Sequence, residues 1–213
     1  MSPPSSTTPG ASEVTEPVSN SELQPEDAAR AGIYGLIARL FYAAPDEGVL
    51  GQLLHSNAFE GSEQPIALAW RELVEAGRTA FPVVLENEHT DLFIGTGKAE
   101  VTPYLTHYTI KFATDNPLVE LRQQLIRWGI ARRENASEPE DHISGVCETM
   151  RFAIAVQQRS LEEQKAFFEH FIYRGGVAFC DAVTASAKSS FYRLVARFAR
   201  EFFELEREAF EMP

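Results

Sequence analysis

The sequence predicts an all-α protein, a single compact helical domain of roughly eight to ten helices behind a disordered N-terminal tail. Two observations predict this fold class. Apolar residues recur at steps of three and four along most of the chain, and no segment alternates apolar and polar residues as a half-buried strand does. The 213 residues, 44% of them hydrophobic, are enough to bury a core.

The predicted chain has two parts, a tail at 1–24 and a helical domain at 25–213. The tail is rich in Ser, Thr, Pro and Glu and offers almost nothing to bury, which predicts disorder. It has neither the basic start nor the apolar core of a secretory signal, and no run approaches the roughly 20 apolar residues that span a bilayer. Cys147 and Cys180 lie far apart in apolar stretches and fit a reducing compartment. We therefore expect a cytoplasmic protein without stable membrane insertion.

Prolines and acidic residues mark the helices of the first half. Pro25, followed by Glu26 and Asp27, predicts a helix start, because Pro suits the first turn and carboxylates suit the positive helix end. Pro45 ends this helix. Further helices are expected over the ranges 49–54, 65–80 and 82–93, with a short helix or helical turn at 104–111.

Caps and glycines mark the helices of the second half. Asp115 is a predicted N-cap, and Gly129 a predicted stop. Ser160-Leu-Glu-Glu163 is a capping box that starts a Phe-rich helix, and Gly175-Gly176 should break that helix. The ranges expected to be helical are 117–129, 140–157, 160–174, 177–187 and 190–210.

Composition and motifs exclude several function classes. A formal net charge of −12 argues against a nucleic-acid binder, since phosphate backbones are held by clustered Lys and Arg, and it favours a basic partner segment. No Gly-x-Ser-x-Gly elbow marks a hydrolase nucleophile. Gly95-x-Gly97-Lys98 lacks the full phosphate-binding pattern and a preceding strand, so a plain loop is favoured.

A helical metal-dependent enzyme is the main rival of another class. A carboxylate-bridged di-metal bundle needs two Glu-x-x-His pairs, and Glu86 with His89 supplies only one. We expect Glu86 and His89 to lie on a solvated helix face. A metal site using Glu86, His89 and His142 would be detected by elemental analysis of the purified protein.

Two segments stand out from ordinary helix packing. In the first, a long loop begins after Leu92-Phe93 and ends at Pro103-Tyr104, and loops of this length often bind partners. The second is Glu138-Pro139-Glu140-Asp141-His142, where carboxylates suit a helix start and can orient the histidine ring. On the residues alone, helix capping and a functional site are equally open for this cluster.

At these two segments the chain resembles the TorD/DmsD/NarJ family of redox-enzyme maturation chaperones. The family pattern is an acidic or aromatic residue before Leu-Phe, a Gly-containing loop, Pro-Tyr with a following Tyr, and a later Glu-x-x-Asp-His. The residues that match it are Glu88, Leu92, Phe93, Gly95, Gly97, Pro103, Tyr104, Tyr108, Glu138, Asp141, His142 and, beyond it, Glu148 and Met150. Thr102 and Thr106 stand where many relatives have Pro and Ser, and Thr106 keeps the hydroxyl.

This resemblance implies a non-enzymatic chaperone without a cofactor. It would bind the twin-arginine signal peptide and the apo-form of a molybdopterin oxidoreductase, assist cofactor insertion, and delay export until the enzyme is folded. Weak GTP binding is associated with some relatives, and the resemblance leaves it open here. An acidic protein suits two arginines, and a groove with aromatic and Leu walls suits the apolar stretch behind them.

The predicted binding site divides by chemistry. The carboxylates assigned to the basic part of the peptide are Glu138, Asp141 and Glu148. The residues assigned to its apolar part are Leu92, Phe93, Tyr104 and Tyr108. Pro103 and Pro139 belong to the same predicted site, and His142 is expected to hydrogen-bond or to switch with pH.

Two questions about the client and assembly stay open on the sequence. The client is either an exported molybdoenzyme, of the trimethylamine-N-oxide reductase, dimethyl-sulfoxide reductase or formate dehydrogenase type, or a non-exported, nitrate-reductase-like enzyme. The protein is either a monomer or a domain-swapped dimer that exchanges elements about a hinge at 131–137.

Overall fold

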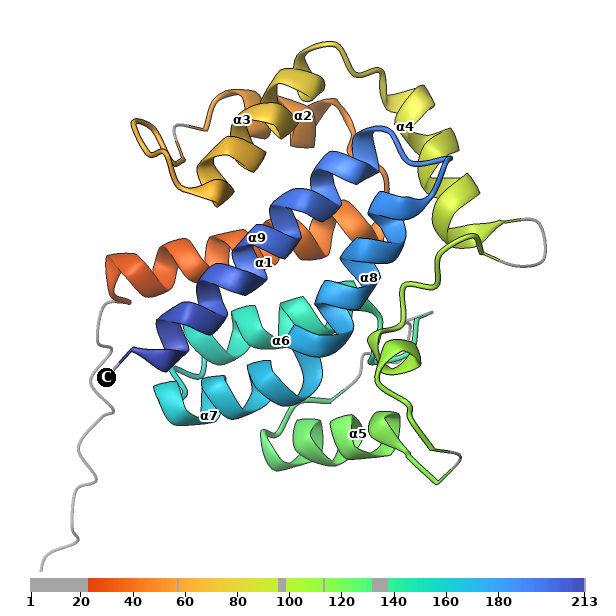
Figure 1. Ribbon diagram of the computed structural model, residues 1–213. Helices are drawn as coiled ribbons and strands as arrows, with labels where there is room; N and C mark the ends of the chain where they lie inside the picture. The colour runs from red at the N-terminus through yellow and green to blue at the C-terminus, as the bar shows by residue number, and fades with distance from the viewer. Residues whose placement is uncertain (1–22, 57, 96–98, 113, 132–137, 213) are drawn as a thin grey trace, which may run out of the picture.

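A computed structural model describes residues 23–56, 58–95, 99–112, 114–131 and 138–212, and it confirms the all-α prediction (Figure 1). The α-helices in these residues are α1 (Pro25–Tyr42), α2 (Glu47–Leu54), α3 (Pro65–Arg78), α4 (Pro82–His89), α5 (Pro117–Arg127), α6 (Ile143–Ala155), α7 (Leu161–Phe167), α8 (Arg174–Ala185) and α9 (Phe191–Glu211). Two π-helical segments, Thr90–Ile94 and Phe168–Tyr173, continue α4 and α7, and a 3-10 turn spans Leu105–Tyr108. Residues 1–22 of the predicted tail and residues 132–137 of the predicted hinge lie outside the described residues.

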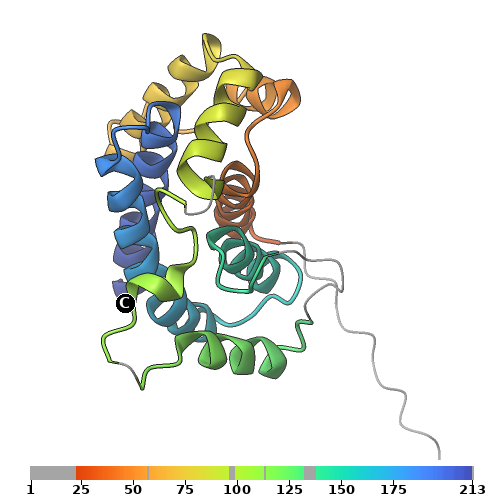
Figure 2. The ribbon, with the colours of Figure 1, turned by 90° about the vertical axis from the view of Figure 1, so that its right-hand side faces the viewer.

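The centre of the domain is the pairing of α1 with α6. Figure 2 views both nearly end on, with α8 and α9 along one side and α5 beneath. The predicted apolar face of α6 is buried, including Met150 and Ile154, and α1 contributes Ile37 and Phe41. Each fully buried side chain of this size stabilises the fold by about 1.5–3 kcal/mol, so this shared interface contributes substantially to stability.

A buried ion pair joins α1, α7 and α9. The Arg30 guanidinium donates to both carboxylate oxygens of Glu206, at 2.8 and 2.9 Å, and to the side-chain oxygen of Gln164 at 3.0 Å. Tyr34 donates its hydroxyl to the same Glu206 carboxylate at 3.0 Å. Burial opposes the charge on Arg30, but the hydrogen bond and attraction of Glu206 outweigh burial and raise the Arg30 pKa. Arg30 therefore stays charged, and its hydrogen bonds to Glu206 and Gln164 join the three helices.

The predicted helix break at Gly175-Gly176 is wrong, because the helix continues from α7 through the π-helical segment into α8. The direction changes between α7 and α8 (Figure 1), as expected where a π-helical turn interrupts an α-helix. A Cβ on Gly175 would lie 2.7 Å from the Leu105 carbonyl oxygen, and one on Gly176 would lie 2.8 Å from Cε2 of Phe203. These glycines are required by close packing and not by a turn.

The predicted helix ends have mixed outcomes. Gly129 ends α5 at φ +67°, and Ser160 with Glu163 forms the predicted capping box. Asp115 is not the N-cap of α5, which is Asn116. The Asp115 carboxylate instead accepts two backbone N–H groups of the preceding turn, each at 2.9 Å, because that turn leaves them without a helical partner.

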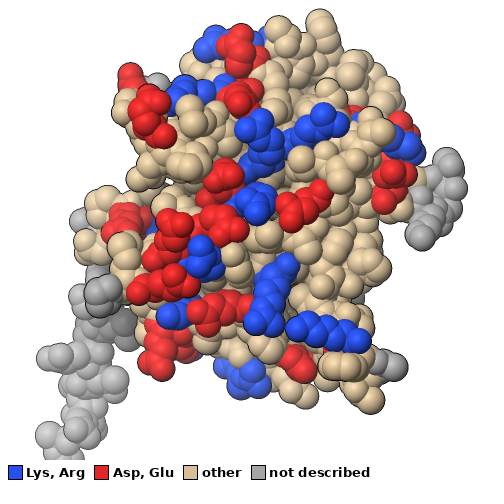
Figure 3. Space-filling view, viewed as in Figure 1, with Lys and Arg blue, Asp and Glu red and all other residues tan. Residues whose placement is uncertain are grey.

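The exposed face of α9 carries charges of both signs in alternation. Arg197 pairs with Glu72 of α3, and Arg200 pairs with Asp181 of α8 at 3.1 Å. Figure 3 shows Lys and Arg interleaved with Asp and Glu over this face. Exposed pairs of this kind contribute about 0–1 kcal/mol each, so they keep the face soluble more than they stabilise it. None of the described helices is both long and apolar enough to cross a membrane.

The close contact at Gly176 gives a test of the fold. Gly176→Ala should lower the free energy of unfolding by about 1–3 kcal/mol, because the added methyl group overpacks the core against Phe203. Gly32→Ala is the matched control, since nothing lies within 4 Å of its Cβ position in α1. Alanine there should stabilise the helix by about 0.5–1 kcal/mol. Urea denaturation measures both, and equal effects would contradict the packing account.

Candidate functional site

Two loops far apart in the sequence are joined by backbone hydrogen bonds. We call the two bonded segments, Pro103–Leu105 and Asp141–Ile143, the clasp. Ile143 N–H donates to the Pro103 carbonyl, and Leu105 N–H donates to the Asp141 carbonyl, each at 2.9 Å. Tyr104 and His142 form the antiparallel bridge between them. The two segments singled out in the sequence therefore form one structural unit.

Side chains complete the clasp. Thr106 donates its hydroxyl to the Asp141 carboxylate, which is buried with 4% of the residue exposed. Tyr104 donates its hydroxyl to Oε2 of Glu138 at 2.7 Å. This bond, followed by burial and the charges of Glu138 and Asp141, raises the pKa of Tyr104 to about 12. Tyr104 and Glu138 are half-buried, so they are the part of the clasp that meets solvent.

His142 is the N-cap of α6. Its Nδ1 accepts the N–H of Ser144 at 3.2 Å, which leaves the proton of the neutral ring on Nε2. Burial lowers the pKa of His142, while the charges of Glu138 and Asp141 raise it by less. In this environment the ring is held neutral.

The predicted start of this helix at Glu140 is wrong, since α6 begins at Ile143. The Asp141 carbonyl and the Ile143 N–H are bonded to the other loop, so the backbone before Ile143 does not form a first helical turn. Pro139 lies in the turn before them, where its carbonyl accepts His142 N–H at 3.2 Å. Glu140 pairs with Arg122 of α5 at 3.0 Å.

The predicted direct contacts of Leu92 and Phe93 with a ligand do not fit the structure, because both residues are in the core. Leu92 is 0% exposed and Phe93 is 7% exposed. Phe93 packs against His89 and Tyr192, each with ring centroids 5.2 Å apart. The Leu92 carbonyl accepts Val101 N–H at 2.9 Å. These residues anchor the loop to the core, and their side chains are too buried to line a binding surface.

The other two predicted site residues lie at different depths. Tyr108 is half-buried, donates its hydroxyl to the Thr102 carbonyl at 2.9 Å, and has its pKa raised to about 12 by burial. It closes the loop that carries the clasp. Glu148 is exposed on α6 and pairs with Arg151 at 2.8 Å, and none of its described contacts reaches the clasp.

One role was missed in the sequence. Glu88 caps α9, accepting N–H groups of Ser190 at 2.7 Å and Tyr192 at 2.8 Å. Its position before Leu92 in the family pattern was a signal, but its partners lie about a hundred residues away.

Glu86 is exposed as expected, whereas His89 is buried with 8% exposed, so the solvated-face prediction is wrong for His89.

The structure describes the candidate metal ligands and only part of the Gly95–Lys98 segment. Within the described ranges, no three His, Cys, Asp or Glu side chains gather in a group that could hold a metal ion. Gly95 ends the π-helical segment after α4 at φ +64°. Gly97 and Lys98 lie outside the described residues.

The fold class is that of a single all-helical domain whose motif residues gather on two joined loops. A protein-family model described as nitrate reductase delta subunit matches residues 60–181. The chain belongs to this family, the TorD/NarJ family of redox-enzyme maturation chaperones, as the resemblance predicted.

Individual relatives agree with this family. The chain is 24% identical to the chaperone protein TorD of Vibrio cholerae serotype O1, El Tor Inaba strain, over 211 residues, which cover 89% of this chain and 96% of that protein. TorD of the classical Ogawa strain matches with the same identity and coverage. A crystal structure of a candidate redox enzyme maturation protein from Archaeoglobus fulgidus superimposes with a TM-score of 0.54 at 22% identity, over 82% of this chain and 93% of that chain. That structure supports the fold.

The neutral state of His142 predicts a pH dependence. Since its folded pKa lies below the unfolded value of about 6.5, the unfolded chain takes up a proton first as the pH falls. The stability that the neutral His142 ring contributes above about pH 6.5 is therefore lost as the pH falls. His142→Asn keeps an N-cap acceptor without the titration, so its free energy of unfolding should fall less between pH 7 and 5. Urea denaturation at both pH values tests this, and NMR should place the His142 midpoint below about 6.5.

Proposed function

We propose that this chain is a chaperone that binds the precursor of a molybdopterin-containing oxidoreductase through its twin-arginine signal peptide and its apo-enzyme body. It would act in the cytoplasm, hold the enzyme for cofactor insertion and delay export until folding is complete. The observation that carries this proposal is the clasp, in which the family motif residues of two distant loops form one rigid unit. Membership of a chaperone family supports the same conclusion.

The half-buried side chains of Tyr104 and Glu138, at and beside the clasp, suit a basic peptide. Glu138 supplies a carboxylate for an arginine, and Arg–carboxylate pairs form short, strong hydrogen bonds. The Tyr104 ring lies next to it and can stack on a guanidinium. The acidic protein, with a net charge of −12, attracts such a segment over longer distances.

The buried residues of the predicted site take positioning roles in this proposal. Asp141 holds Thr106, and with Pro103 and Pro139 it fixes the backbone on which Tyr104 and Glu138 are presented. Leu92, Phe93 and Tyr108 support the loop, and His142 orders the start of α6. Glu148 would extend the acidic surface along α6.

A non-exported client is the second candidate function. The matching family model is described by the delta subunit of nitrate reductase, which favours assembly of an enzyme that stays in the cytoplasm. In that case the chaperone would recognise an N-terminal segment or the body of the client without an export signal. Binding to an apo-enzyme that lacks its leader would distinguish the two.

Leader binding is tested by calorimetric titration with synthetic twin-arginine leaders from candidate molybdoenzymes, at low and moderate salt. Glu138→Gln should weaken binding about tenfold or more, because a hydrogen bond to a charged group contributes about 1.5–3 kcal/mol. Tyr104→Phe should weaken it by less, through loss of the bond that orients Glu138. Added salt should also weaken binding to the wild type.

Glu47→Gln on α2 is the matched control, since Glu47 is exposed and lies outside the clasp. It makes the same change of charge and should leave affinity unchanged. Equal weakening by Glu47→Gln would show that affinity depends on the net charge of the protein and not on Glu138 in particular. Binding to the leaderless apo-enzyme with no binding to any leader would favour the second candidate.

A further inference from the structure

An arginine of the protein itself is bound on residues 138–142, which we call the clasp loop. Arg122 of α5 donates its Nε–H and an Nη2–H to Oε2 of Glu140, at 3.1 and 3.0 Å. The two residues lie 18 positions apart, so the contact joins α5 to the clasp loop. The Glu140 side chain is 15% exposed and the Arg122 side chain 46% exposed. The carboxylate is therefore largely enclosed, whereas the arginine bonded to it is open to solvent.

Glu140 differs from the other carboxylates of the clasp loop in the kind of group that it accepts. Glu138 and Asp141 each accept a side-chain hydroxyl group, whereas Glu140 accepts a guanidinium. This hydrogen bond, followed by the charges of Glu140 and Asp141, raises the pKa of Arg122. Arg122 thus interacts with more than one carboxylate of the clasp loop. The structure therefore shows a guanidinium seated on the segment that the family motif marks.

The proposed client brings the same chemical group. A twin-arginine leader carries two guanidinium groups, and Glu138 and Glu140 lie two residues apart in the clasp loop. If a client arginine replaces Arg122 on Glu140, one guanidinium–carboxylate pair is exchanged for another, so no carboxylate is left without its cation. The displaced Arg122 returns to water at low cost, because its side chain is already open to solvent.

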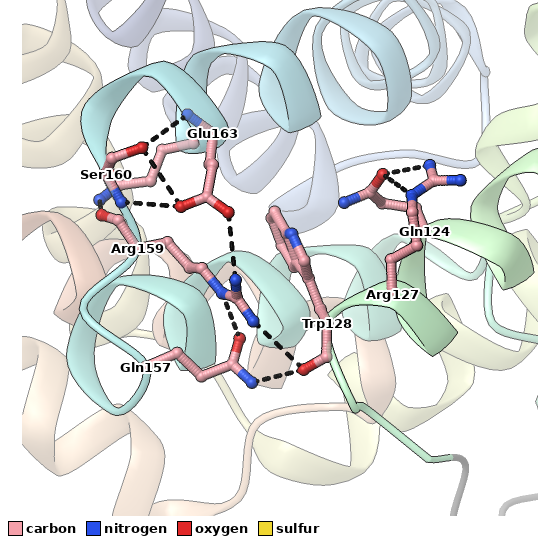
Figure 4. Close-up of polar contacts among 8 residues, drawn as sticks. Gln124, Arg127, Trp128, Gln157, Arg159, Ser160 and Glu163 are labelled. Atoms are coloured by element: carbon pink, nitrogen blue, oxygen red, sulfur yellow. Dashed lines mark hydrogen bonds and ion pairs between the residues drawn. The ribbon is translucent and has the colours of Figure 1, made fainter.

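The attachment of α5 does not depend on this contact. Leu121 is buried beneath the helix. At its C-terminal end, the Trp128 carbonyl accepts side-chain N–H groups of Gln157 at 2.7 Å and Arg159 at 3.4 Å (Figure 4). These contacts hold α5 on the core when its pair with the clasp loop is broken. Glutamine is also nearly as good a helix former as arginine, so Arg122→Gln should fold.

We propose that Arg122 is an internal competitor for the client's arginines, which occupies Glu140 in the free chaperone and is replaced there by an arginine of the leader. Glu140 is then the second arginine-binding carboxylate of the site, beside Glu138. A leader with lysines would exchange less well, because an ammonium group does not reproduce the planar fork of a guanidinium. This inference rests on the proposed function, since the client's arginines are part of it.

The first test is calorimetric titration of Arg122→Gln with a leader that binds the wild type. Removing the competitor should tighten binding about two- to fivefold, the factor that corresponds to one exposed ion pair. Arg127→Gln is the matched control, because it makes the same change of charge on the same helix. Arg127 donates to the side-chain oxygen of Gln124, with Nε at 3.2 Å, and pairs with no carboxylate among the described residues (Figure 4). Its substitution should leave the affinity unchanged at moderate salt.

Two results of this titration would overturn the proposal. Equal tightening by Arg122→Gln and Arg127→Gln would reveal a general effect of net charge. Weaker binding by Arg122→Gln would mean that Arg122 supports the bound leader and does not compete with it.

A double-mutant cycle tests whether Glu140 is the shared partner. Glu140→Gln alone should change the affinity little, because it removes the client's pair and the internal pair together. In the Arg122→Gln background, the same substitution should cancel the two- to fivefold gain. A gain that persists in the double variant would contradict competition at Glu140.

A probe that is not a leader separates this inference from the proposed function. N-acetyl-Arg-Arg-amide at millimolar concentration should shift the Arg122 Nε–H signal in NMR and leave the Arg127 Nε–H signal in place. If that happens while no leader binds, the proposed function fails and the competitor role stands. If leaders bind but the dipeptide leaves the Arg122 signal unchanged, the proposed function stands and the competitor role is overturned.

Discussion

The buried pair of Arg30 and Glu206 determines how the helices of this domain are arranged. Removing one partner of such a pair leaves a buried charge, at a cost of about 3–5 kcal/mol. The pair fixes α1 against α9, and through Gln164 it also fixes α7. Since α6 packs on α1, the position of the clasp depends on the same interaction. The candidate site therefore depends for its geometry on one polar contact in the core.

The sequence predicted helices well wherever a local interaction decides the outcome. The stripe of α6, the capping box at Ser160 and the positive φ of Gly129 all follow from residues within one or two turns. The predictions failed where a distant partner decides. Gly175 and Gly176 are local helix breakers, but their role is to admit Leu105 and Phe203, which the sequence places far away.

The motif located both loops of the clasp, but it gave no information on depth. Leu92 and Phe93 look like ligand-binding residues because they flank a loop, whereas the aromatic cluster around His89 and Tyr192 buries them. The helix begins at Ile143 and not at the predicted Glu140, because backbone groups of Asp141 and Ile143 are bonded to the other loop of the clasp.

The π-helical segment Phe168–Tyr173 also controls rotational register. Each residue of an α-helix turns the chain by about 100°, so one residue added to a turn rotates every later side chain by that angle about the helix axis. In this chain the added residue brings the two glycines of α8 to face Leu105 and Phe203. A helix of the same length without it would present neighbouring, larger side chains to those partners. The loop carrying Tyr104 could then not approach α8 as closely, so the clasp is aligned in part by a helical defect outside it.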